Sequence, residues 1–179
     1  MRSGSVLRLG VRLGVAATVA AGLLLAPAPT RAADDGGPFG VGLIVGSPLG
    51  IALKYYLGRS GHAVDFVIGD AVAGARGILV HADYLWHPAV VLRERAFDLP
   101  VYVGIGARLL DHDRSRIDGD DDFHVGARVP AGLLFDFKEL PLEVFAESAL
   151  VLDFRVGDER GHGGFGLDLN VGVGGRYYF

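Results

Sequence analysis

The sequence predicts an all-β fold: an eight-stranded antiparallel up-and-down transmembrane β-barrel that follows an N-terminal signal peptide. Three observations lead to this fold class. The first residues have the pattern of an export signal, the remaining chain alternates apolar and polar side chains in eight segments, and the polar faces combine glycine with charge. We therefore divide the chain into a signal peptide, residues 1–32, and one barrel domain, residues 33–179.

The composition excludes several functional classes. The 179 residues suit a single domain. The absence of cysteine excludes disulfides, thiolate zinc sites and cysteine nucleophiles. A formal net charge of -4 lacks the basic excess of nucleic-acid-binding proteins, so we expect no nucleic-acid partner. The mean hydropathy of +0.36 together with 28 glycines is unusual for a soluble domain.

The signal peptide is predicted from the order of its parts. Arg2, Arg8 and Arg12 precede an apolar stretch at 14–25, and small residues lead to a cleavage site after Ala32. The alternative is a membrane anchor, but the apolar stretch is shorter than the roughly 20 residues that a spanning helix needs. Export is therefore the favoured interpretation.

Eight segments have the period-two pattern of β-strands, in which every second residue is apolar. They are residues 39–45, 51–57, 64–68, 78–86, 101–109, 123–137, 142–154 and 165–179. Turn-like stretches separate them at 47–49, 58–61, 70–76, 88–98, 111–122, 138–140 and 157–164. With a periplasmic N-terminus, 111–122 and 157–164 lie outside the cell. The stretch 88–98 is long for a periplasmic turn, so a different local boundary or an extension of a strand into it is the alternative.

The polar faces of the strands distinguish a membrane barrel from a soluble sandwich or lipocalin-like barrel. A face built for water carries many charges and few glycines, whereas a narrow lumen needs glycine beside long charged side chains. The lumen face is predicted to hold ten charged residues: Lys54, Asp65, Asp83, Arg108, Arg128, Glu143, Glu147, Asp153, Asp168 and Arg176. The opposite face has no charge within the strands, as expected for side chains that meet lipid.

Aromatic residues gather where the strands reach the periplasmic side. We predict a periplasmic aromatic girdle of Tyr55, Tyr84, Trp86, Phe135 and Phe137, continued by the aromatic residues at the end of the chain. A sparser outer girdle would contain Phe123, Phe154 and Phe165.

The last segment, residues 166–179, alternates apolar residues up to Phe179, with Tyr177 two positions earlier. It resembles the C-terminal signature of bacterial outer-membrane β-barrels, and the whole chain is similar to the small barrels of the OmpA and OmpX type. The phrases at 42–48, 80–87 and 100–106 are similar to an uncharacterised outer-membrane barrel family with spirochaete members. The resemblance implies an outer-membrane location, outer-membrane lipids and the barrel assembly machinery as partners, and Tyr177 and Phe179 as the assembly signal. It implies no established activity.

The charged lumen residues are predicted to form a hydrogen-bonded network, because unpaired charges are expensive to bury. Hairpin counting places Glu143 beside Arg176, and Asp65 opposite Asp83 with Lys54 relieving their repulsion. The favoured interpretation is a plug that holds the barrel together, with a structural or surface-binding role for the protein. The alternative is a small channel or passive transporter, since arrays of opposite charges also line ion paths.

Other sites are predicted to be absent. A lipid-modifying outer-membrane enzyme is a distant alternative, because Ser148 stands on the apolar face with no histidine expected beside it. The acidic stretch 111–122 does not match a calcium-loop pattern, so we interpret it as a solvated surface loop and expect no metal and no cofactor. This stretch and 157–164 are the expected contact points for any extracellular or host ligand.

Overall fold

The computed structural model describes residues 36–58, 60–71, 77–112, 122–156 and 164–179. The predicted signal peptide, residues 1–32, lies outside the described residues, as do most of the two predicted outer loops. No helix among the described residues is long and apolar enough to cross a membrane.

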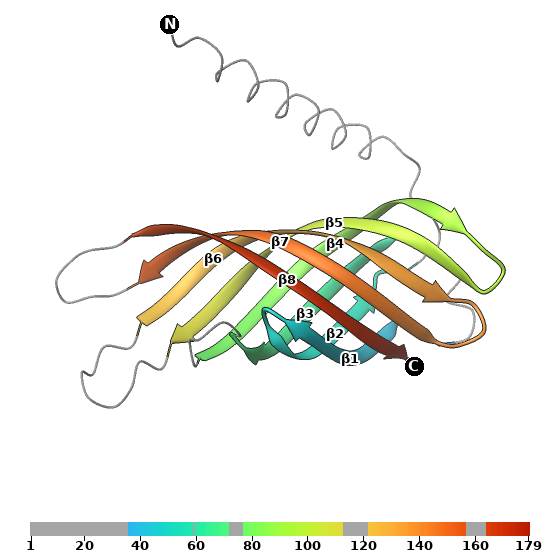
Figure 1. Ribbon diagram of the computed structural model, residues 1–179, viewed down its shortest axis with the longest axis horizontal. Coiled ribbons are helices and arrows are strands. Elements are labelled where there is room, and N and C mark those ends of the chain that lie inside the picture. Colours follow the sequence, from blue (N-terminus) through green and yellow to red (C-terminus); the bar gives the residue numbers. More distant parts are fainter. Residues whose placement is uncertain (1–35, 59, 72–76, 113–121, 157–163) are drawn as a thin grey trace, which may run out of the picture.

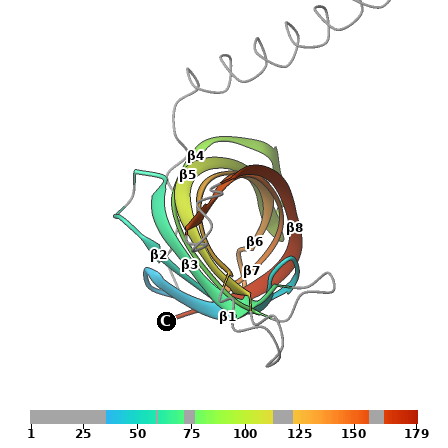
Figure 2. The ribbon, with the colours of Figure 1, turned by 90° about the vertical axis from the view of Figure 1, so that its left-hand side faces the viewer.

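Eight strands form one closed barrel in which each strand pairs antiparallel with the next and β8 closes on β1 (Figures 1 and 2). The strands are β1 (Phe39–Gly46), β2 (Leu49–Tyr56), β3 (His62–Asp70), β4 (Gly77–Arg93), β5 (Phe97–His112), β6 (Asp122–Phe137), β7 (Leu142–Val156) and β8 (Phe165–Tyr178). The predicted all-β, eight-stranded antiparallel architecture is therefore confirmed. Closure leaves no free sheet edge.

We call the end where β1 begins and β8 finishes the proximal end, and the opposite end the distal end. The connections β2–β3, β4–β5 and β6–β7 lie at the proximal end, because successive strands alternate in direction. The strands differ in length: β1 and β2 have 8 residues each, whereas β4 has 17 and β5 has 16. The β4–β5 hairpin therefore extends beyond the shorter strands.

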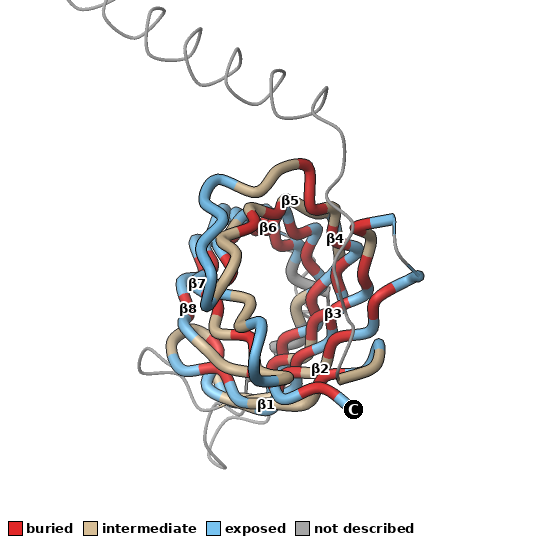
Figure 3. The backbone as a smooth tube through the Cα atoms, turned by 90° about the vertical axis from the view of Figure 1, so that its right-hand side faces the viewer, coloured by how far each residue is buried: buried red, intermediate tan, exposed pale blue. Residues whose placement is uncertain are grey.

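Exposed and buried residues alternate along the strands (Figure 3). The exposed positions are apolar, with Leu43 63%, Ile105 66% and Leu150 56% exposed, whereas the charged side chains of Lys54 and Arg128 point inward and are 1% exposed. This distribution is the reverse of a soluble barrel, which turns its apolar side chains inward. The period-two pattern of the sequence thus assigned the two faces correctly.

The predicted turn at 88–98 is too long, and the alternative of a strand extension is confirmed. β4 continues to Arg93 and β5 begins at Phe97, so only three residues connect them. The register shifts between Trp86 and Ala89, which accommodates Pro88, a residue without a backbone N–H to donate. Because a proline at a bulge is compatible with a strand, it was a misleading turn signal here. The predicted loop 111–122 also begins and ends with residues that belong to β5 and β6.

Candidate functional site: the charged lumen

All ten predicted lumen residues lie on the inward-facing positions of the strands. Nine of them are buried, and the tenth, Asp168, has a side chain that is 50% exposed near the distal end. The hydrogen bonds and ion pairs between them connect residues on opposite walls of the barrel as well as on neighbouring strands. We describe this set, the lumen network, from the proximal to the distal end.

Glu143 is the centre of the proximal part. Its carboxylate accepts hydrogen bonds from Lys54 Nζ at 3.1 Å, Tyr56 Oη at 2.9 Å, Tyr178 Oη at 3.1 Å and Arg176 Nη1 at 2.9 Å. The predicted pairing of Glu143 with Arg176 is therefore confirmed, both in register and in side-chain contact. Four donors on one carboxylate satisfy a fully buried charge.

Asp65 and Asp83 lie directly opposite each other on β3 and β4, as predicted. Lys54 lies opposite Asp65 in the register, so its charge is close to the pair as predicted, but its hydrogen bonds go to Glu143 and His87. Two arginines make the direct contacts with the carboxylates. Arg176 Nη2 donates to both oxygens of Asp65 at 2.8 Å, and Arg128 Nε donates to Asp83 Oδ2 at 2.7 Å. Curvature and shear carry these side chains across the lumen, which hairpin counting does not include.

The central and distal parts of the lumen network are built on Arg128 and Arg108. Arg128 also pairs with Glu147, which accepts a second hydrogen bond from Tyr102 Oη at 2.8 Å. Arg108 pairs with Asp153, and its Nη2 also lies 2.9 Å from Asp168 Oδ2. Both arginines donate to the amide oxygen of Asn170, at 2.9 Å and 3.2 Å. The described charged side chains thus form ion pairs along the length of the barrel.

Inward-facing glycines make room for these side chains, as the sequence suggested. A Cβ added at Gly106 would overlap Asp83 Oδ1 and the carbonyl oxygen of Ala82. One at Gly126 would overlap the carboxylate of Asp153. The glycine-rich face is therefore a packing requirement of the narrow lumen.

Sequence reasoning missed the aromatic residues that fill the proximal lumen. Tyr56, Tyr102 and Tyr178 are each 4% exposed or less, and His87 packs against the rings of Tyr56 and Tyr102 with centroids 5.5 Å and 5.8 Å away. His87 Nδ1 lies 2.7 Å from the carbonyl oxygen of Gly61, so it donates there and leaves Nε2 to accept from Lys54 at 3.3 Å. The signal was present: each tyrosine lies two positions from a lumen charge or glycine.

The predicted girdle residues Tyr55, Tyr84 and Phe135 point outward and are exposed, whereas Trp86 and Phe137 are partly exposed. Phe97 was missed because it fell in the wrongly predicted turn. Its ring packs against those of Phe135 and Phe137, with centroids 5.7 Å and 6.5 Å away.

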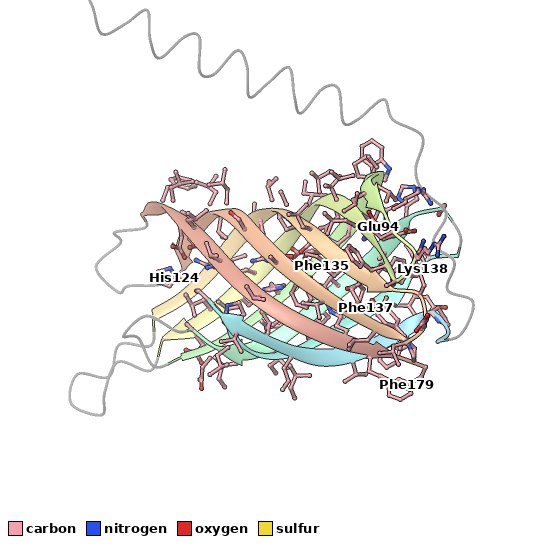
Figure 4. The ribbon with its side chains drawn as sticks, turned by 45° about the vertical axis from the view of Figure 1, so that its right-hand side comes forward. Glu94, His124, Phe135, Phe137, Lys138 and Phe179 are labelled. Atoms are coloured by element: carbon pink, nitrogen blue, oxygen red, sulfur yellow. The ribbon has the colours of Figure 1, made fainter. Side chains whose placement is uncertain are left out.

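The labelled side chains in Figure 4 show the two ends: Phe137, Lys138 and Phe179 lie toward the proximal end, and His124 lies toward the distal end. Tyr177 and Phe179, the predicted assembly signal, are exposed, and their rings pack edge to face 5.1 Å apart. Their role in assembly stays a prediction.

Ser148 faces outward, and the residues opposite it on the neighbouring strands are Ala131 and Val171. His81, in contrast, is buried inside the barrel. Ser148 and His81 therefore lie on opposite faces of the sheet. The expectation that the protein is not an enzyme stays a prediction.

No protein-family model matches the chain, and no curated protein matches it. Among solved structures, the barrel is similar to the N-terminal β-barrel domain of Pseudomonas aeruginosa OprF, with a TM-score of 0.53 and 19% sequence identity. The match covers 81% of this chain and 100% of that domain. The likeness confirms the predicted OmpA-like barrel architecture. The narrower resemblance to a family with spirochaete members stays a prediction.

Proposed function

We propose that this chain is an integral outer-membrane β-barrel protein whose lumen is plugged by its own side chains, and that its role is structural or surface-binding. The observation that carries the membrane part is the outward-facing belt of apolar side chains. The side chains of Val129, Leu150 and Leu169 are each more than half exposed, and lipid would cover this apolar surface. The export-type N-terminus and the C-terminal pattern support the outer membrane as its location.

The plug is supported by the lumen network. A channel needs a continuous path for water, but inward-facing arginines, carboxylates and tyrosines occupy both the central and the proximal lumen. Each described cation there is paired with at least one carboxylate, so ion pairs take the place of hydration. The surface-binding part rests on the sequence of residues 111–122 and 157–164, which join strands at the distal end.

A pair of lysine substitutions tests the membrane location. Val129 lies in the middle of β6 and is 55% exposed, and Leu140, which is 57% exposed, lies in the β6–β7 connection. Val129→Lys should cost about 2–4 kcal/mol of stability in lipid vesicles, because it puts a charge near the bilayer centre. Leu140→Lys, which adds the same charge outside the strands, should cost less than about 1 kcal/mol. Reversible urea unfolding in vesicles measures both values.

Equal effects of the two substitutions would contradict a membrane-spanning belt, as would recovery of the exported wild-type protein in the aqueous fraction without detergent. The plug is tested separately by planar-bilayer recording of the refolded protein. We expect no steady single-channel steps. Regular steps would replace the plug with the channel interpretation and leave the membrane location intact.

A further inference from the structure

Three side chains with metal-ligand chemistry meet inside the barrel between β3 and β4. Asp65 and Asp83 are directly opposite in the register, and His81 faces the lumen two residues before Asp83. One ligand atom from each of the three lies within 4.8 Å of the others. His81 Nε2 lies 3.7 Å from Asp83 Oδ2.

His81 and Asp83 carry unpaired polar atoms at this place. Within the described residues, neither ring nitrogen of His81 has a hydrogen-bond partner, and Asp83 Oδ1 has none. The side chains of both residues are 0% exposed. Buried polar groups are almost always paired with protein, water or an ion, so the two unpaired ring nitrogens of His81 and the unpaired Oδ1 of Asp83 point to a missing ligand.

The lumen around the three residues contains charges of both signs. Nine buried charged side chains of the lumen network comprise four cations and five carboxylates, a net of -1. Two arginines already bind these carboxylates: Arg128 donates to Asp83 Oδ2, and Arg176 donates to both oxygens of Asp65. Each carboxylate oxygen has a second lone pair, so these hydrogen bonds orient the carboxylates and leave acceptor positions for an ion.

We propose that Asp65, His81 and Asp83 form a binding site for a divalent transition-metal cation of the Zn²⁺ class. One imidazole with two carboxylates suits such ions, whereas Ca²⁺ and Mg²⁺ prefer oxygen ligands alone. Zinc ligands at about 2.1 Å from the ion lie about 3.5 Å from one another, close to the separation of His81 Nε2 and Asp83 Oδ2. The site revises the expectation of no metal, and it does not depend on where the barrel resides.

Metal titration of the folded, detergent-solubilised protein tests the site after treatment with a chelator. Zn²⁺ binding is measured by calorimetry and Co²⁺ binding by visible absorption. The variants are His81→Gln, Asp83→Asn and, as a matched control, His62→Gln, which removes a half-buried histidine outside the lumen that contacts Tyr84. The wild type and H62Q should each bind one equivalent of metal ion. H81Q and D83N should bind that ion at least about tenfold more weakly.

Equal binding by all four proteins, or no stoichiometric binding by the wild type, would overturn the site and leave a water molecule as the partner of His81. If H81Q does not fold, D83N still decides, because asparagine keeps an oxygen for Arg128. X-ray absorption of the zinc-loaded wild type gives a measurement without any variant. A zinc coordination shell with one imidazole nitrogen and carboxylate oxygens supports the proposal. A coordination shell of oxygen atoms alone overturns it.

Discussion

The proximal and distal halves of the lumen use the same ion-pair chemistry in different surroundings. In the proximal half, Glu143 accepts from four side chains and is fully buried among tyrosine rings. In the distal half, Arg108 joins Asp153 to Asp168, whose side chain is 50% exposed. Water can replace a lost partner at the distal end but not at the proximal end. The comparison predicts that similar ion pairs contribute very differently to stability.

The largest effect is expected at Glu143. Glu143→Ala removes the shared acceptor of Lys54 and Arg176, which leaves Lys54 without its carboxylate in a dry environment. Breaking a buried ion pair in this way costs about 3–5 kcal/mol. Equilibrium urea unfolding of the folded barrel in detergent measures the loss.

Glu139→Ala is the control for this substitution, since Glu139 is an exposed carboxylate at the same end of the barrel. Its removal should change the free energy of unfolding by less than about 0.5 kcal/mol. A loss below about 1 kcal/mol for E143A would mean that water reaches the proximal lumen and that the two halves do not differ.

An intermediate effect is expected from filling the space beside Asp83. The added Cβ of Gly106→Ala would overlap Asp83 Oδ1 and a backbone carbonyl, neither of which can move freely. Overpacking of this kind costs about 1–3 kcal/mol. At Gly166, near the distal end, an added Cβ meets nothing within 4 Å. Gly166→Ala should therefore be neutral within about 0.5 kcal/mol, and equal losses in the two variants would count against a tightly packed central lumen.

The smallest effect is expected at Asp168. Asp168→Asn weakens its ion pair with Arg108, but that arginine keeps Asp153 and Asn170 as partners. A half-exposed pair contributes less than about 1 kcal/mol, and salt screens it. Unfolding midpoints of D168N and the wild type at low and high salt should converge. A loss comparable to that of E143A would show that the distal end is as dry as the proximal end.

The strands and their faces were predictable because they depend on local order. Alternation placed Lys54, Arg128 and Glu147 inside, and hairpin counting paired Glu143 with Arg176. The length of the turn predicted at 88–98 was wrong, because Pro88 gives the same sequence signal in a turn and at a bulge.

The contacts across the lumen were not predictable in the same way. Lys54 reaches Glu143, and Arg128 on β6 reaches Asp83 on β4, because the barrel closes with a particular stagger. Stagger is a property of the whole sheet, and no short segment specifies it. The unpaired ring nitrogens of His81 were not predictable either, because they depend on which side chains the other strands bring near.

The unequal strand lengths have a mechanical consequence. Strands β1 and β2, with 8 residues each, are about 27 Å long, and β4, with 17, is about twice that length. The barrel wall is therefore shorter on the side of β1 and β2 than on the side of β4. A bilayer around such a barrel would have to become thinner beside the short strands. Alternatively, the barrel axis would have to tilt away from the membrane normal.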